Sequence, residues 1–176
     1  MWPWGHLGLG YLLALPVLAR VDLDGDPVAL AALAVGTQLP DLVDKPLAWT
    51  FGVMPYGRAA AHSLLVLGTA AVVLWLVTES DRVRVPLLAG WASHFVGDVA
   101  YPLGEGALGE VTFLAWPLLG LPEPAGDHGI LAYVQNVALT GETAFEVGLF
   151  ALAGGGFVVR QWRTRGAPTG TSEGAD

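Results

Sequence analysis

The sequence contains no cysteine and few charged residues. Without cysteine the chain forms no disulfide and offers no thiolate, so any metal it binds must use nitrogen and oxygen ligands. Only 14% of its 176 residues are charged, whereas 53% are hydrophobic. The mean hydropathy is +0.54. This composition is typical of a protein surrounded by lipid rather than by water.

Basic residues are scarce as well. One lysine, Lys45, stands against seven arginines, and the net charge is −8, so a nucleic-acid-binding surface is not expected. Such an acidic, lysine-poor composition is typical of proteins from a high-salt cytoplasm, although a GC-rich genome gives the same residue usage. Residues 1–19 contain no charged side chain and so lack the basic start of a cleavable signal peptide. We expect them to belong to the mature fold.

Five apolar stretches rich in Leu, Ala and Val predict helices. A full membrane span needs roughly 20 residues, so the first two are short and the last three are better candidates. The sequence predicts an all-α fold, a polytopic membrane bundle of about five helices in one domain over residues 1–165. Residues 166–176 lack apolar periodicity and are expected to be a disordered tail. The stretches are His6–Ala19, Pro27–Pro40, His62–Thr78, Val85–Pro102 and Gly141–Val159, and the segment 103–140 has room for one short helix.

Basic residues near the ends of these stretches indicate an orientation. Six of the eight follow the first, third and fifth stretches. If the chain crosses at each stretch, these three loops share one side, and their excess of basic residues marks that side as cytoplasmic. The sequence therefore predicts a multi-pass protein of the cell (inner) membrane. The six residues are Arg20, Arg82, Arg84, Arg160, Arg163 and Arg165.

Histidines and acidic residues gather at the opposite ends of the same stretches. His94 and Asp98 are four residues apart and therefore share one face of a helix. The same topology places further ionisable residues at the non-cytoplasmic end of each other stretch. We therefore expect one polar cluster toward the non-cytoplasmic face. The further residues are His6, Asp41, His62, Glu142 and Glu146, and the long loop adds Asp127 and His128.

A divalent cation explains why such residues stand in apolar helices. An ionisable side chain within a membrane helix costs ~2.5–3.5 kcal/mol and usually has a partner. Neutral imidazoles with a carboxylate bind zinc and leave a position open for water, as in catalytic zinc sites. Several histidines and carboxylates also have the capacity for two ions ~3.5–4 Å apart. Zinc is the favoured ion, with manganese, iron and magnesium as alternatives for nitrogen and oxygen ligands.

Simpler interpretations of single residues stay open. His94 and Asp98 also suit a hydrogen-bonded polar pair inside a helical bundle. His6 suits an interfacial histidine, and Asp41 suits a turn or helix cap. Asp44 is expected to form an ion pair with Lys45 or Arg58 rather than to bind metal, whereas Arg58 and a cation are equally suitable partners for Glu146.

Five short motifs carry a family resemblance: W-G-H at 4–6, Q-L-P-D-L-V-D-K-P at 38–46, G-R-A-A-A-H-S at 57–63, S-H-F-V-G-D at 93–98 and F-E-V-G at 145–148. In this order, over roughly residues 4–150, they resemble the membrane-bound metal-dependent hydrolases described as LexA-binding and inner-membrane-associated. That family is thought to be distantly related to zinc-dependent phospholipase C, so the resemblance implies a phospholipase C-like arrangement of helices. It also implies metal-ligand roles for His6, Asp41, His62, His94 and Asp98.

The sequence thus predicts a metal-dependent hydrolase acting on an ester or phosphoester, with membrane lipids as partners and an amphiphile as substrate. In this hypothesis Glu146 ligates the metal or serves as general base, and Arg58 holds an anionic group of the substrate. No G-x-S-x-G motif occurs, so a serine hydrolase is not expected. Two alternatives stay open: a non-catalytic membrane interaction or scaffold protein, and a small ion-handling transporter.

Overall fold

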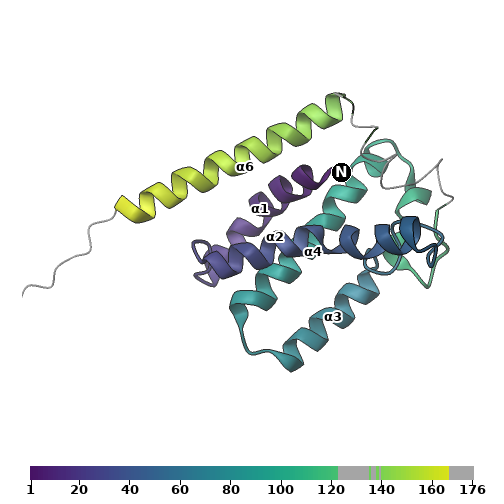
Figure 1. Cartoon of the computed structure of the whole chain (residues 1–176), viewed down its shortest axis with the longest axis horizontal. Coiled ribbons are helices and arrows are strands. Elements are labelled where there is room, and N and C mark those ends of the chain that lie inside the picture. Colours follow the sequence, from purple (N-terminus) through teal and green to yellow (C-terminus); the bar gives the residue numbers. More distant parts are fainter. Residues whose placement is uncertain (123–134, 136–137, 139, 167–176) are drawn as a thin grey trace, which may run out of the picture.

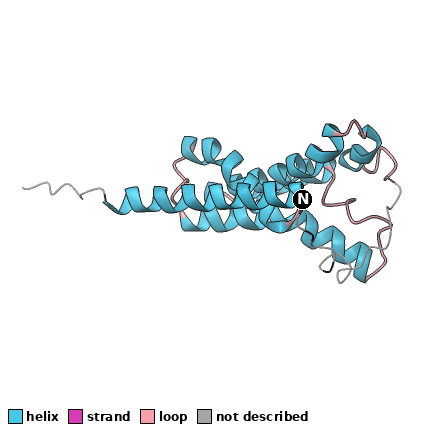
Figure 2. Cartoon of the chain, turned by 90° about the horizontal axis from the view of Figure 1, so that it is seen from above, coloured by secondary structure: helices cyan, strands magenta, loops and turns pink. Residues whose placement is uncertain are grey.

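The computed structural model describes residues 1–122, 135, 138 and 140–166. Over these residues the chain consists of helices and loops with no strand (Figure 2), which confirms the all-α prediction. Each of the five apolar stretches forms an α-helix, and the segment 103–140 contributes one short 3-10 helix. Asp127, His128 and the tail from residue 167 lie outside the described residues. The elements are α1 (Pro3–Arg20), α2 (Pro27–Lys45), the π-helical turn η1 (Pro46–Thr50), α3 (Leu64–Val77), α4 (Asp81–Gly104), the 3-10 helix η2 (Leu108–Ala115) and α6 (Gly141–Gly166).

Two helix boundaries matter for the site. Helix α2 does not end at Pro40, where the apolar stretch ends, but continues to Lys45. Asp41 is therefore a helical residue rather than a turn residue. Helix α3 begins at Leu64 after its N-cap Ser63, whose hydroxyl accepts a hydrogen bond from Leu65 N at 3.1 Å. His62 thus precedes the helix, in the loop that follows η1.

Helix α4 is central, because it packs against α1, α2 and α3. Helix α6 lies along α1, and both helices start at the same end of the molecule (Figure 1). Since α1 carries most of the contacts of α6, much of the surface of α6 remains uncovered. Only 17% of its most apolar 18-residue window is buried.

Helices α2 and α4 touch through their backbones. A Cβ atom on Gly90 of α4 would overlap the carbonyl oxygen of Leu33 in α2, and one on Gly36 of α2 would overlap the carbonyl oxygen of Leu87 in α4. Close contact through small residues is typical of helices packed in membranes. This contact sets the spacing between Asp41 and His94. Asp41 lies about one helical turn beyond Gly36 in α2, and His94 lies about one turn beyond Gly90 in α4.

We expect Gly90→Ala to lower the free energy of unfolding by ~1–3 kcal/mol, because the added methyl group meets backbone that cannot turn aside. Thermal unfolding in detergent measures the change. Gly104→Ala, in the same helix, is the matched control because no atom lies within 4 Å of its Cβ position. Equal melting temperatures for the two variants would contradict the close approach of α2 and α4.

Ion pairs gather at one end of the bundle. Asp26, the N-cap of α2, pairs with Arg82 at the start of α4, and Asp24 pairs with Arg160 near the end of α6. The same end therefore holds the last turn of α1, the start of α2 and α4, and the end of α6. The opposite end holds the start of α1 and α6 together with the end of α2.

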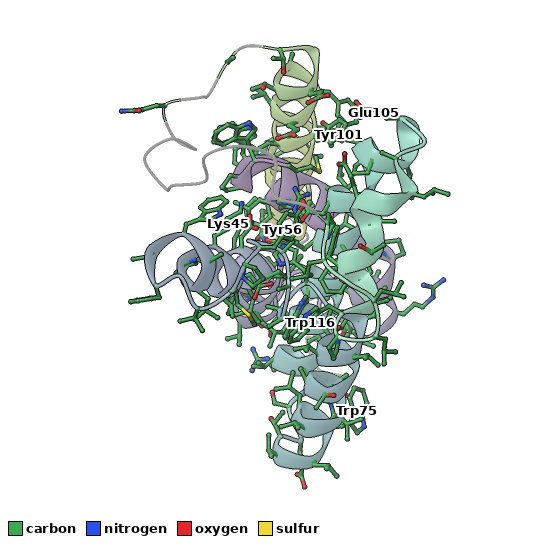
Figure 3. The ribbon with its side chains drawn as sticks, turned by 90° about the vertical axis from the view of Figure 1, so that its right-hand side faces the viewer. Lys45, Tyr56, Trp75, Tyr101, Glu105 and Trp116 are labelled. Carbon is green, nitrogen blue, oxygen red and sulfur yellow. The ribbon has the colours of Figure 1, made fainter. Side chains whose placement is uncertain are left out.

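Large apolar side chains cover the outside of α3 and α6. On α3 the exposed ones include Leu76, 80% exposed, and Trp75, which lies far from Tyr101 and Glu105 at the other end of the molecule (Figure 3). A helix that is apolar on its outer side fits a lipid environment. By length and composition, one helix among the described residues qualifies as a span, over Gly141–Trp162, while the apolar α3 has 14 residues. Multi-pass topology therefore stays a prediction.

Candidate metal centre

Three histidines and two aspartates from four separate elements meet inside the protein. His6 lies in the first turns of α1, Asp41 near the end of α2 and His62 in the loop before α3. His94 and Asp98 lie one turn apart on α4. The side chains of His6, His62 and His94 are fully inaccessible, and those of Asp98 and Asp41 are 2% and 11% exposed. The fold thus brings all five predicted ligands together.

The distances within this cluster match those between ligands of one ion. His62 Nε2 lies 3.1 Å from His94 Nε2 and 3.3 Å from Asp98 Oδ2. Asp41 Oδ1 lies 3.5 Å from His62 Nε2, and His6 Nε2 lies 3.3 Å from Asp98 Oδ1. Ligand atoms about 2.0–2.2 Å from a tetrahedral zinc are separated by roughly 3.3–3.6 Å. Two overlapping groups offer ligand atoms within 4.8 Å of one another: His6, His94 and Asp98, and Asp41, His62 and His94.

Two of the imidazoles are held by their outer nitrogens. His62 Nδ1 lies 2.8 Å from Asp44 Oδ2, and His94 Nδ1 lies 2.7 Å from the carbonyl oxygen of Thr37. A carbonyl accepts only, so His94 Nδ1 carries the hydrogen and its Nε2 is left with a lone pair toward the cluster. Hydrogen bonds from the outer nitrogen to carboxylate or carbonyl are the usual support of metal-bound histidines.

Asp44 is the functional residue that the sequence analysis missed. The structure pairs it with neither Lys45 nor Arg58. Its buried carboxylate instead accepts hydrogen bonds from the backbone nitrogens of Ala59, Ala61 and His62, at 2.8, 2.9 and 3.2 Å, as well as contacting the His62 ring. It thereby fixes the whole loop that carries His62. The signal was present in the sequence, because the three-residue spacing of Asp41 and Asp44 places both on one face of α2.

Buried polar atoms without a hydrogen bond point to a ligand. Both ring nitrogens of His6 are buried and form no hydrogen bond, although His6 Nε2 lies 3.3 Å from Asp98 Oδ1. Leaving such groups unsatisfied costs about 1–3 kcal/mol each. A cation contacted by His6 Nε2 satisfies one of these nitrogens, and imidazole nitrogen with carboxylate oxygen is a donor set that fits a divalent metal.

Basic side chains pair with both aspartates of the cluster. Lys45 Nζ lies 2.6 Å from Asp41 Oδ2, which leaves Asp41 Oδ1 facing His62 and His94. Arg58 Nε lies 3.0 Å from Asp98 Oδ2, and the side chain of Arg58 is 30% exposed. Arg58 therefore connects the buried cluster with the protein surface.

Glu146 lies beside the cluster rather than in it. Its Oε2 accepts a hydrogen bond from Trp2 N at 2.8 Å, and its Oε1 accepts one from the Tyr101 hydroxyl at 3.2 Å. The ion pair with Arg58 that we considered for it does not form, because Arg58 pairs with Asp98. Glu146 belongs to neither group of candidate ligands in the described part of the chain. It joins α6 to the start of α1, and His6 enters the cluster about one turn further along α1.

Metal binding is expected to strengthen as the pH rises. Burial lowers the pKa of His62, but hydrogen bonds to Asp41, Asp44 and Asp98 outweigh it and raise that pKa to about 10. The metal-free ring is therefore protonated at neutral pH, and an incoming ion must displace that proton. For one displaced proton the zinc affinity rises about tenfold per pH unit. Competition with a zinc chelator at pH 6, 7 and 8 measures this slope, and a pH-independent affinity would contradict His62 as a ligand.

The site and the surface together define a class: an all-helical membrane-associated protein with a buried cluster of histidines and aspartates. The family follows from the sequence comparison. Residues 1–160 match the model of the YdjM inner membrane protein family, and the chain belongs to that family. This confirms the inner-membrane part of the resemblance, while the family description does not extend to hydrolase activity or to phospholipase C. No curated protein and no solved structure matches the sequence.

Proposed function

We propose that this protein is a membrane-bound metal-dependent hydrolase that acts on an ester or phosphoester. The observation that carries the proposal is the convergence of three imidazoles and two carboxylates in one buried cluster, with two of the imidazoles oriented through their outer nitrogens. A purely structural polar cluster would satisfy its own hydrogen bonds, whereas this one leaves both ring nitrogens of His6 without one. The residues therefore suit a metal better than a polar pair.

One ion is the stoichiometry that we propose. Both candidate groups contain His94, and its Nδ1 is already bonded to Thr37. Only His94 Nε2 is left, and one imidazole nitrogen binds one metal. The three histidines favour zinc, which takes nitrogen and oxygen ligands in catalytic sites and lowers the pKa of bound water toward 7. Of Asp41 and Asp98, the one that does not bind the ion directly helps to orient the histidines that do.

Arg58 and Glu146 take different parts in this proposal. Arg58 reaches the surface from the cluster, so its guanidinium is placed to bind an anionic oxygen of a substrate that approaches Asp98. Glu146 is occupied by Trp2 N and the Tyr101 hydroxyl, and its contacts suit positioning of α1, and with it His6, better than proton transfer. We therefore replace the general-base hypothesis for Glu146 with a positioning role.

The polar cluster and the arginine-rich end lie at opposite ends of the bundle. Arg82 and Arg160 mark one end, while His6 and Asp41 lie at the other. If the arginine-rich end faces the cytoplasm, the metal centre faces the non-cytoplasmic headgroup region. This position favours a lipid or another amphiphile as the substrate.

The test is turnover by the purified protein. We expect zinc-loaded protein in lipid nanodiscs to hydrolyse a substrate from a panel of phospholipids and chromogenic phosphoesters, and Asp98→Asn to abolish that turnover. Glu105→Gln, at the end of the same helix and exposed, is the matched control and keeps it. Zinc bound without turnover of any substrate would favour a scaffold protein, and ion flux in liposomes would favour a transporter.

A further inference from the structure

A cavity of about 230 Å³ lies between α1, α2 and α6, partly open to the outside. Its lining is apolar except for Tyr11 and Thr37. Sites for whole drug-sized ligands have volumes of about 300–1,000 Å³, so this cavity suits a segment of an apolar chain rather than a complete amphiphile.

One end of the cavity lies beside residues that support the metal centre. Leu7, in its lining, follows His6 directly, and Thr37, also in its lining, accepts the hydrogen bond from His94 Nδ1 at 2.7 Å. From Phe150 to Phe157 the lining follows α6 for seven residues, which is roughly 10 Å of helix. The cavity thus begins beside Thr37, which supports His94, and runs along the helix that is suited to span the membrane.

Tyr11 places one polar atom in this apolar wall. Its hydroxyl is buried and forms no hydrogen bond, and its ring meets Phe157 edge-on with a centroid distance of 6.1 Å. An unsatisfied buried hydroxyl is costly, and an ester carbonyl is an acceptor that satisfies it. Tyr11 lies one helical turn beyond Leu7, and its contact with Phe157 puts it toward the end of the cavity that is farther from the metal centre.

The outer side of α6 gives access from the membrane. Leu152 and Val158 are 64% and 63% exposed beside the residues that line the cavity. A side of this kind faces lipid in a membrane protein, so an acyl chain can enter laterally without crossing water.

We propose that this cavity binds one ester-linked acyl chain of a membrane glycerophospholipid, with its ester carbonyl at the Tyr11 hydroxyl. Binding of the acyl chain requires neither metal nor turnover. The proposal rests on the proposed function only where it names this lipid as the substrate of the hydrolase. It accounts for the apolar lining, the partly open side and the unsatisfied Tyr11 hydroxyl.

Two neighbouring glycines provide a matched test. Gly154 lines the cavity and Gly155 does not, and nothing lies within 4 Å of the Cβ position of either. Gly154→Leu therefore places a side chain at the cavity without meeting backbone, and Gly155→Leu makes the same change on the same helix outside it. Ala34→Phe fills the cavity from α2 and Ala31→Phe, exposed on the same helix, is its control.

The experiment uses the full chain in phosphatidylcholine liposomes that contain a small fraction of phosphatidylcholine with a diazirine on one acyl chain. After illumination, mass spectrometry locates the labelled residues. We expect labels on the cavity-lining residues of α1 and α6, reduced about tenfold by Gly154→Leu and by Ala34→Phe and unchanged in both controls. Circular dichroism and melting temperature show that each variant is folded.

Labelling that is confined to exposed residues of α3 and α6, or that the cavity variants leave unchanged relative to their controls, would overturn the lipid site. The proposed hydrolase fails by a different result, the absence of turnover in the zinc-loaded wild-type protein. If the cavity is labelled but the protein shows no turnover, the lipid site is supported and the lipid is not a substrate.

Discussion

Replacing His94 with alanine is expected to remove the bound metal. His94 is the one residue common to both candidate ligand groups, and its Nε2 lies 3.1 Å from His62 Nε2 and 3.5 Å from Asp98 Oδ2. Loss of a residue that only supports a ligand costs about 10- to 100-fold in metal affinity, so loss of a ligand itself should cost more. Metal content by inductively coupled plasma mass spectrometry should fall from about one zinc per chain to background.

Ser93→Ala is the control for this variant. Ser93 is the buried neighbour of His94 on α4, and its hydroxyl donates to the carbonyl oxygen of Gly90 and not to the cluster. We expect this protein to keep its zinc. Retention of zinc by a folded His94→Ala variant would show that the five residues do not form the metal centre, whatever the fate of the catalytic proposal.

The second large effect is expected at Asp44, which is not itself a candidate metal ligand. Its carboxylate contacts the His62 ring at 2.8 Å and accepts hydrogen bonds from three backbone nitrogens of the loop that precedes α3. An amide in Asp44→Asn keeps one acceptor and turns the other into a donor, so the loop and the ring lose part of their support. We expect the zinc affinity to fall about 10- to 100-fold, as for other partners of metal-bound histidines. Competition with a chelator measures it.

Asp26→Asn makes the same chemical change at the other end of α2 and is the control for Asp44→Asn. Asp26 caps α2 through the backbone nitrogens of Val28 and Ala29 and pairs with Arg82, far from the cluster. Asparagine also caps helices well, so both the fold and the zinc affinity should be kept. Equal affinities for the two variants would contradict the supporting role of Asp44.

The helices could be predicted from the sequence because they depend on local pattern. Apolar stretches between charged or Gly/Pro-rich segments located five α-helices. The largest boundary error was the end of α6, at Gly166 rather than Val159, and the error that matters for the site was the end of α2, where the helix passes through Pro40 to Lys45. Proline removes one backbone donor but does not always end a helix that is held by tertiary contacts. Membrane crossing was harder to predict, because it depends on the length of each helix and on how much of its surface the other helices cover. Helix α6 is long and largely exposed, whereas α3 is apolar but short.

The candidate ligands could also be predicted, because their grouping follows from topology alone. His94 and Asp98 share a helix face by spacing, and the ends of the other stretches meet them at one end of the bundle. The partners of Asp44 and Glu146 could not be predicted, since these contacts join residues 15 to 144 positions apart. Asp44 binds a loop whose path no local pattern fixes, and Glu146 meets the start of α1 only because α6 packs along α1.

X-ray absorption spectroscopy of the zinc-loaded wild-type protein at the zinc edge tests the central claim most directly. One ion held by either candidate group, each with two histidines and an aspartate, gives nitrogen and oxygen neighbours at about 2.0–2.2 Å, and the outer-shell scattering that is characteristic of imidazoles. The account predicts this spectrum. A shell of oxygen atoms without imidazole scattering, or protein that retains no zinc after purification in zinc-containing buffer, would contradict it.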